Sequence, residues 1–248
     1  GILIVENLQD WTYKIWEEIV SEDFLNDHMT DILNWDFSLN YWMDKILIEE
    51  KLIAWNWFEK FCNFGLADIR MIVYNLVPVA AMVRMPTALS GWKANLAQGW
   101  LGLGIEVGSW IINTLYINWK VYTKEFPMPY AHLKWFEIPF WDEILLASSQ
   151  TQFFVNLWYL ALDWVITETW PKILEINARA WLEIQNVCLL PLKNRLDKLK
   201  DLKITEAEKW VELAKSLFSA KVTNKFNSQK IIYLSQEAKL NYLNQSEN

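Results

Sequence analysis

The spacing of apolar positions in the first quarter of the chain predicts amphipathic helices. In 6–33 and in 39–64, large apolar side chains recur every three or four residues, and charged residues occupy the other faces. Ser21 is followed by Glu22 and Asp23, which is typical of an N-cap with acids in the first helical turn. We therefore expect a helix to begin at this point.

Two shorter apolar helices are predicted next, from Ala67 to Val77 and from Val79 to Met85. Pro78 and Pro86 end them, because proline lacks the backbone N–H that a helix interior requires.

The stretch from Leu89 to Trp119 is the most apolar, and it predicts a central helix around which the others pack. Gly104 and Gly108 are four residues apart, so on a helix they share one face and let a second helix approach closely. This contact suits a membrane helix and a tightly packed soluble bundle equally well.

A stretch rich in proline and aromatic residues, 126–141, predicts a long irregular connection. It divides the chain into an N-terminal helical region, 1–125, and a C-terminal helical region, 142–248, which is more charged after residue 190. In the second region, Ile144–Ile166 is apolar and Thr205–Glu208 matches a capping box.

Strict alternation of apolar and polar residues is weak throughout, so few strands are expected. The predicted fold class is all-α, with long tryptophan-rich amphipathic helices around an apolar, glycine-containing central helix.

Composition narrows the functional classes. The 248 residues include 17 tryptophans, 53% are hydrophobic and the formal net charge is −7, so we predict no nucleic-acid partner. Cys62 and Cys188 are the only cysteines, and their wide separation favours buried free thiols over a disulfide.

Motifs for common catalytic sites are missing. His28 and His132 are the only histidines, and no zinc-site or phosphate-loop spacing occurs. We therefore predict no catalytic residue, no metal and no cofactor, and a protein that is not an enzyme.

Two acids stand alone in apolar runs. Glu106 and Asp163 are expected to be buried, either as functional carboxylates with raised pKa values or as partners of a nearby base. Arg70 and Arg84 are the candidate partners.

Residues 99–119 are long enough to span about 30 Å of hydrocarbon as a helix. Their eight Leu, Ile and Val residues favour insertion by about 2.5–5 kcal/mol, and Glu106 opposes it by about 3 kcal/mol. Insertion is therefore marginal, and 144–166 is a weaker candidate for lipid contact.

Aromatic and apolar residues also recur at intervals of eleven, a period that keeps one stripe along a straight helix. The positions are Tyr13, Phe24, Trp35, Ile46 and Trp57, then Trp119, Tyr130 and Trp141, then Tyr159, Trp170 and Trp181. In this the chain resembles the tape-measure proteins of phage tails. The resemblance implies an elongated assembly protein that sets tail length and helps the genome pass a membrane.

The leading hypothesis is a non-enzymatic structural subunit of a larger assembly, such as a virion, with other protein subunits covering its apolar surface. The alternative is an accessory subunit of a membrane complex, with one or two embedded helices and a charged C-terminal arm. A third class is an enzyme or carrier with an aromatic-lined cavity that contains Glu106 or Asp163. Localisation to a virion or a membrane-associated assembly is favoured over free cytosol.

Overall fold

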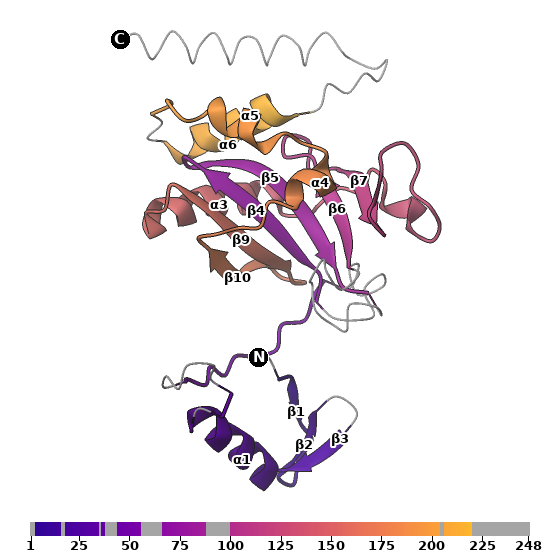
Figure 1. Ribbon diagram of the computed structural model, residues 1–248, viewed down its shortest axis with the longest axis vertical. Coiled ribbons are helices and arrows are strands. Elements are labelled where there is room, and N and C mark those ends of the chain that lie inside the picture. The colour runs from indigo at the N-terminus through magenta and orange to yellow at the C-terminus, as the bar shows by residue number, and fades with distance from the viewer. Residues whose placement is uncertain are drawn as a thin grey trace. The chain divides into compact units, whose positions relative to one another are not determined.

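The structure is a computed structural model that describes residues 3–15, 18–34, 36–37, 44–55, 66–87, 100–203 and 206–219. It contains two compact units, Gly1–Ile53 and Ala54–Asn248, which are described separately (Figure 1).

The first unit contains a small antiparallel sheet followed by one helix. Strands β1 (Val5–Asn7), β2 (Thr12–Ile15) and β3 (Glu18–Ser21) pair in chain order. Helix α1 (Glu22–Leu33) follows at once, and the Ser21 side chain accepts a hydrogen bond from the backbone N–H of Phe24 at 3.4 Å. The N-cap predicted at Ser21 is confirmed, but the residues before it form strands.

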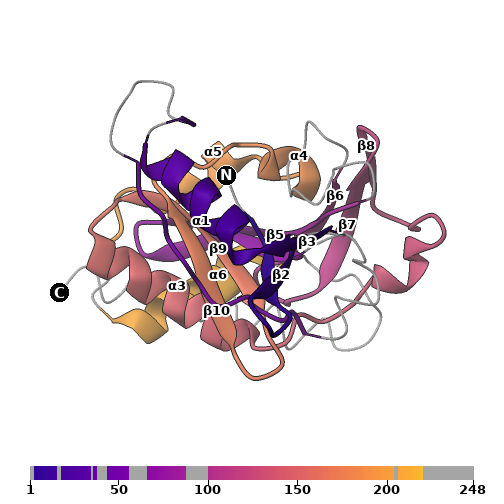
Figure 2. The same cartoon turned by 90° about the horizontal axis from the view of Figure 1, so that it is seen from below.

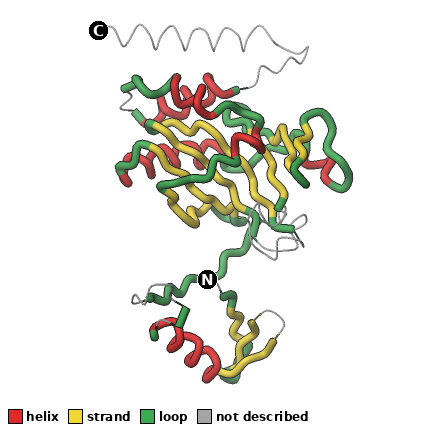
Figure 3. The backbone as a smooth tube through the Cα atoms, in the orientation of Figure 1, coloured by secondary structure: helices red, strands yellow, loops and turns green. Residues whose placement is uncertain are grey.

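The second unit is built on a seven-stranded antiparallel sheet with the order β10, β9, β4, β5, β6, β7, β8. Its strands are β4 (Asp68–Tyr74), β5 (Val77–Met85), β6 (Leu101–Ile105), β7 (Ile112–Ile117), β8 (Lys120–Tyr122), β9 (Tyr159–Ile166) and β10 (Pro171–Asn177). Figure 3 shows the strands of this unit as one layer with helices packed against it.

Helices cover both faces of this sheet (Figure 2). The described helices of this unit are η3 (Tyr130–Leu133), α3 (Trp141–Val155), α4 (Ile184–Cys188), α5 (Leu192–Asp197) and α6 (Ala207–Phe218). Helix α3 lies on the face that bears Trp164, whose Nε1 donates to Ser148 at 3.1 Å. Helix α4 lies on the opposite face, over Gly102 and Gly104, and α6 packs against α3 and β5.

The predicted all-α class is wrong, because the molecule has a mixed fold organised by antiparallel sheets. The runs 67–77 and 79–85 are strands β4 and β5, joined by a turn at Asn75 and Leu76 with φ of 48° and 67°. Every residue of β5 is buried. A strand covered on both faces has no polar alternation, so its sequence looks like that of a buried helix.

The predicted central helix is also wrong. Residues 101–117 form strands β6 and β7, and residues 89–99 lie outside the described part of the chain. Gly104 lies on β6 and Gly108 in the turn after it, so they do not share a helical face. Each does permit a close approach: a Cβ on Gly104 would meet Cys188 of α4, and one on Gly108 would meet Ser219 just after α6.

Three further predictions concern the helix over 39–64, the cysteines and the helix after residue 208. Residues 44–55 contain no helix, and the rest of 39–64, with Cys62, falls outside the described ranges. Cys188 is a free thiol. A helix is present where one was expected after Thr205–Glu208: α6 begins at Ala207, with Glu206 as its N-cap and no side-chain hydrogen bond to the cap. The predicted capping box is thus not formed by Glu206, and Thr205 lies outside the described residues.

The three-part division at 126–141 stays a prediction, although β4 and β9, from either side of that stretch, pair in one sheet. Within the described ranges, no helix has the length and apolar character needed to cross a membrane. Residues 144–166 are divided between α3 and β9. Contact of 99–119 and 144–166 with lipid or other protein subunits stays a prediction.

Gly104→Ala is expected to lower the free energy of unfolding by about 1–3 kcal/mol through overpacking. The added Cβ would clash with Oγ1 of Thr114 and lie 3.1 Å from Cα of Cys188. Urea denaturation measures the change. The same substitution in a Thr114→Ala background should cost less, and an equal cost in both backgrounds would rule out this clash.

Candidate active site

Four charged side chains meet on the face of the sheet that α4 partly covers. Asp68 and Arg70 come from β4, Arg84 from β5 and Asp163 from β9. Asp68 is the direct register partner of Arg84, and Arg70 is the partner of Asp163. Antiparallel pairing therefore brings residues up to 95 positions apart in sequence into one group, which we name the charge cluster.

The charge cluster is held by paired hydrogen bonds. Nε and Nη2 of Arg70 donate to the two carboxylate oxygens of Asp163 at 2.8 and 2.7 Å. Nε and Nη2 of Arg84 donate to Asp68 at 2.6 and 2.7 Å, and Nη2 also lies 2.8 Å from Oδ2 of Asp163. Such two-point pairs fix the plane of each guanidinium group.

Each arginine has one nitrogen, Nη1, that makes no hydrogen bond to the described part of the chain. No described residue accepts a hydrogen bond from Nη1 of Arg70 or of Arg84, while their other nitrogens are engaged by carboxylates. Guanidinium N–H groups in a fixed fork match the oxygens of phosphate and carboxylate ligands. The charge cluster therefore holds two oriented donors that an anion can use.

Burial governs the electrostatics of the cluster. All four side chains are at most 12% exposed. Burial raises the pKa of Asp68 from 3.8 to about 6, and the neighbouring Arg84 guanidinium only partly offsets this rise. Burial acts to lower the pKa of Arg84, but Asp68 and Asp163 outweigh it and the pKa is raised. Arg84 thus stays charged.

Oxygen ligands for a cation lie on the neighbouring edge strand. Glu175 of β10 is the register partner of Asp163, and Nδ2 of Asn177 donates to Oδ2 of Asp163 at 3.3 Å. Glu175 reaches this position because the register shifts by one residue between Ile173 and Glu175. Carboxylate and amide oxygens are the ligands that Mg²⁺ prefers.

Among the described residues, no group of three or more His, Cys, Asp or Glu residues is placed to hold a metal ion. A cation that arrives with a phosphate ligand needs fewer protein groups, since Mg²⁺ is commonly held by one or two carboxylates together with phosphate oxygens and water. Asp163, Glu175 and Asn177 fit that mode of binding.

The structure places the residues singled out in the sequence at different points. Asp163 is 3% exposed and pairs with both Arg70 and Arg84, the two bases considered as its partners. Glu106 is also buried, but it accepts a hydrogen bond from Ser109 at the other end of β6, away from the charge cluster. Gly104 and Gly108 allow Cys188 and Ser219, respectively, to pack closely against the backbone.

Three residues of the site were not found from the sequence: Asp68, Glu175 and Asn177. Their signal was local, because Asp68-x-Arg70 and Glu175-x-Asn177 each put two polar residues on one face of a strand. That spacing has meaning only once the segments are known to be strands.

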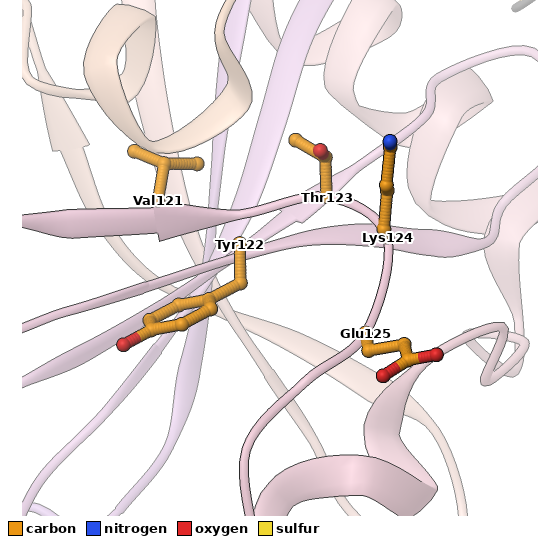
Figure 4. A pocket seen from close by; sticks show the side chains of 5 residues that line it. All are labelled: Val121, Tyr122, Thr123, Lys124 and Glu125. Atoms are coloured by element: carbon orange, nitrogen blue, oxygen red, sulfur yellow. The ribbon is translucent and has the colours of Figure 1, made fainter.

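A shallow surface hollow of about 520 Å³ lies elsewhere, along residues 121–125 (Figure 4). Val121, Thr123 and Lys124 point to one side of this segment and Tyr122 to the other. A single stretch of chain lines the hollow, without the convergent polar groups of a binding site. The charge cluster is therefore the stronger candidate.

A known family matches most of the chain. A family model described as sugar-transfer associated ATP-grasp matches residues 1–218. No curated protein sequence matches the chain.

This match overturns four expectations. The resemblance to phage tail tape-measure proteins is wrong, since the matching family is a different one and the molecule is rich in sheet. The non-enzymatic assembly subunit, such as a virion component, and its membrane-embedded alternative are wrong for the same reason. The prediction that the chain is not an enzyme is also wrong, because an ATP-grasp family points to an ATP-utilising enzyme.

Asp163→Asn is expected to lower the free energy of unfolding by about 3–5 kcal/mol, because it leaves two buried arginines without their shared counter-charge. Guanidinium denaturation provides the measurement. Asp197→Asn is the matched control, because Asp197 pairs with Lys193 on an exposed surface and its loss should leave stability unchanged within error. Equal effects of the two variants would contradict the role of Asp163.

The stability of the protein should depend on pH through Asp68. Its folded-state pKa, about 6, lies above the ordinary 3.8, so the folded state binds the proton more tightly than the unfolded state. The contribution of Asp68 is fully present below about pH 4 and is lost as the pH rises to about 6. Asp68→Asn removes this titration. The stability difference between wild type and variant should therefore fall across that interval and be flat above it, and a flat difference throughout would refute the assignment.

Proposed function

Because the chain belongs to the sugar-transfer associated ATP-grasp family, we propose that it is an ATP-utilising enzyme of the ligase or transferase type. The nucleotide phosphates bind at Arg70 and Arg84, on the face of the sheet partly covered by α4.

One observation carries this proposal: the two guanidinium groups are oriented by carboxylates, and the described residues offer no acceptor to Nη1 of either group. A nucleotide triphosphate is an extended anion whose oxygens match such donors. Arg70 and Arg84 come from adjacent strands, so both donors reach one ligand without a rearrangement of the backbone.

Asp163, Glu175 and Asn177 are the residues that would hold the divalent cation bound to the nucleotide. That cation neutralises phosphate charge during phosphoryl transfer, a reaction that depends mainly on positioning and electrostatic stabilisation. The protein contributes positioning, since Asp163 touches both arginines and is the register partner of Glu175. Phosphates and cation would thus be aligned by one carboxylate.

The balance of positive and negative side chains in the charge cluster favours an anion that arrives with a bound cation. In the charge cluster two arginines face two aspartates, so a free polyphosphate would gain little net attraction there. A nucleotide carrying a cation presents positive charge to Asp163 and Glu175 and phosphate oxygens to the arginines. The family description also names an association with sugar transfer, and we propose that the reaction takes place in connection with sugar transfer.

The test is direct binding of ATP with Mg²⁺ to the full chain by calorimetry. Arg84→Met should weaken binding at least about tenfold, because hydrogen bonds to charged groups contribute about 1.5–3 kcal/mol. Lys124→Met is the matched control, since it removes one positive charge at the surface hollow and should leave the Kd unchanged.

Two results would overturn the proposal. One is the absence of binding to the wild-type protein. The other is a loss of affinity in the Lys124 variant with none in the Arg84 variant, which would move the nucleotide to the hollow.

A further inference from the structure

Large apolar side chains are exposed at the end of the sheet where β4 turns into β5. The segment 153–158, which runs from the last turn of α3 to the start of β9, contains no charged residue. Its side chains Phe153, Phe154, Val155 and Trp158 are between 39% and 82% exposed, and we name these four the apolar surface. Single exposed apolar side chains are ordinary, whereas a group of them on one short segment indicates a binding surface.

The fold holds the apolar surface in place from both sides. The rings of Phe153 and Trp210 of α6 are 6.4 Å apart between centroids, and those of Trp158 and Tyr74 of β4 are 5.7 Å apart, edge to face. Between them, Asn156 ends α3 with φ of 55°. The exposed aromatic rings therefore belong to a sharp, well-packed turn between a helix and a strand.

A lysine-rich loop lies against the same end of the sheet. The stretch 198–203 (Lys-Leu-Lys-Asp-Leu-Lys) follows α5, and its three lysines are exposed; we name it the basic loop. Asn75 joins it to the apolar surface. The backbone N–H of Asn75 donates to the oxygen of Trp158 at 3.1 Å, and its Nδ2 donates to the oxygens of Leu199 and Leu202 at 2.6 and 2.8 Å.

We propose that the apolar surface and the basic loop together bind the surface of a bilayer that contains anionic lipids. Aromatic side chains enter the interface between headgroups and acyl chains, and neighbouring lysines are attracted by anionic headgroups. The lipid contact predicted for 144–166 thus falls on 153–158, at the surface of the bilayer and not across it. Binding of this kind is independent of the nucleotide site.

The charges favour a lipid surface over a protein partner. Lysine is depleted at protein–protein interfaces, whereas lysines beside an apolar surface are typical of segments that lie on anionic membranes. The whole chain has a formal net charge of −7, yet the basic loop has three lysines and one acid, Asp201. An anionic bilayer therefore repels most of the chain and attracts this end, which also fixes the orientation of the bound molecule.

Sedimentation of the full chain with lipid vesicles tests the proposal. The probes are vesicles of phosphatidylcholine alone and vesicles of an equimolar mixture of phosphatidylcholine and phosphatidylglycerol. Wild type should partition into the pellet with the mixed vesicles and much less with the neutral ones. Added salt should weaken this binding, because it screens the attraction between lysines and headgroups.

Trp158→Gln should lower the partition coefficient for the mixed vesicles about tenfold, because the burial of a large apolar side chain is lost. Trp119→Gln is the matched control, since Trp119 is 77% exposed and packs edge to face on one tyrosine, Tyr116, as Trp158 does on Tyr74. Trp119 lies in the turn between β7 and β8, at the other edge of the sheet. Its substitution should change the partition coefficient by less than about twofold.

The basic loop is tested by a variant with three lysines replaced, Lys198→Gln, Lys200→Gln and Lys203→Gln. Each lysine near an anionic surface strengthens binding about fivefold, so the three replacements should weaken it about a hundredfold. The control removes the same charge from exposed positions elsewhere, through Lys51→Gln, Lys120→Gln and Lys124→Gln. It should retain most of the wild-type binding.

Three results would overturn the proposal. The first is the absence of wild-type binding to the mixed vesicles. The second is an equal loss of binding in a variant and its matched control, which would separate lipid binding from this end of the sheet. The third is self-association of the wild-type chain that Trp158→Gln abolishes, without binding to vesicles, which would assign the apolar surface to a second copy of the chain.

Discussion

The structure depends on one requirement, that four buried charges neutralise one another. Removing a carboxylate or a guanidinium group from water costs several kcal/mol unless it is paired and hydrogen-bonded. Asp163 satisfies this requirement for both arginines, and Asp68 for one of them. Because these residues come from three strands, the pairing also constrains the sheet. A shift of one residue in any strand would turn its charged side chain to the opposite, apolar face. Strand register and site geometry are thus maintained by the same contacts.

The pairing of Asp163 with Arg70 and Arg84 was among the alternatives open from the sequence, because isolated charges in apolar runs must find partners. The sheet that arranges them was not predictable. Strand β5 consists of Val, Pro, Ala, Met and Arg and is buried throughout, so it shows neither strand alternation nor a strong turn signal at its ends. The turn before it uses Asn75 and Leu76, without the glycine that marks many hairpins. A local signal succeeded where a local contact decides, as at Ser21, whose side chain caps α1.

The site was missed for a related reason. Sequence motifs for catalytic and metal sites combine histidines, cysteines or glycines at short spacing, whereas this site draws single residues from strands between positions 68 and 177. The spacing of aromatic residues predicted a stripe along a helix, but Trp100 and Trp164 lie on opposite faces of a sheet. The ring of Trp100 covers Gly102 beside Arg84, and Nε1 of Trp164 donates a hydrogen bond to Ser148 of α3. The large number of tryptophans therefore indicated little about the position and contacts of each one in the fold.

The register shift in β10 has a further consequence. Leu174 is the bulged residue, and in a strand of regular register Leu174 rather than Glu175 would stand opposite Asp163. The same bulge, with Pro171 at the start of the strand, interrupts the outer edge of the sheet, which protects it from pairing with another chain. At the other edge, β8 is only three residues long. The bulge thus both interrupts this edge of the sheet and sets Glu175 opposite Asp163, so a substitution that forced β10 into regular register would affect solubility and the proposed cation site together.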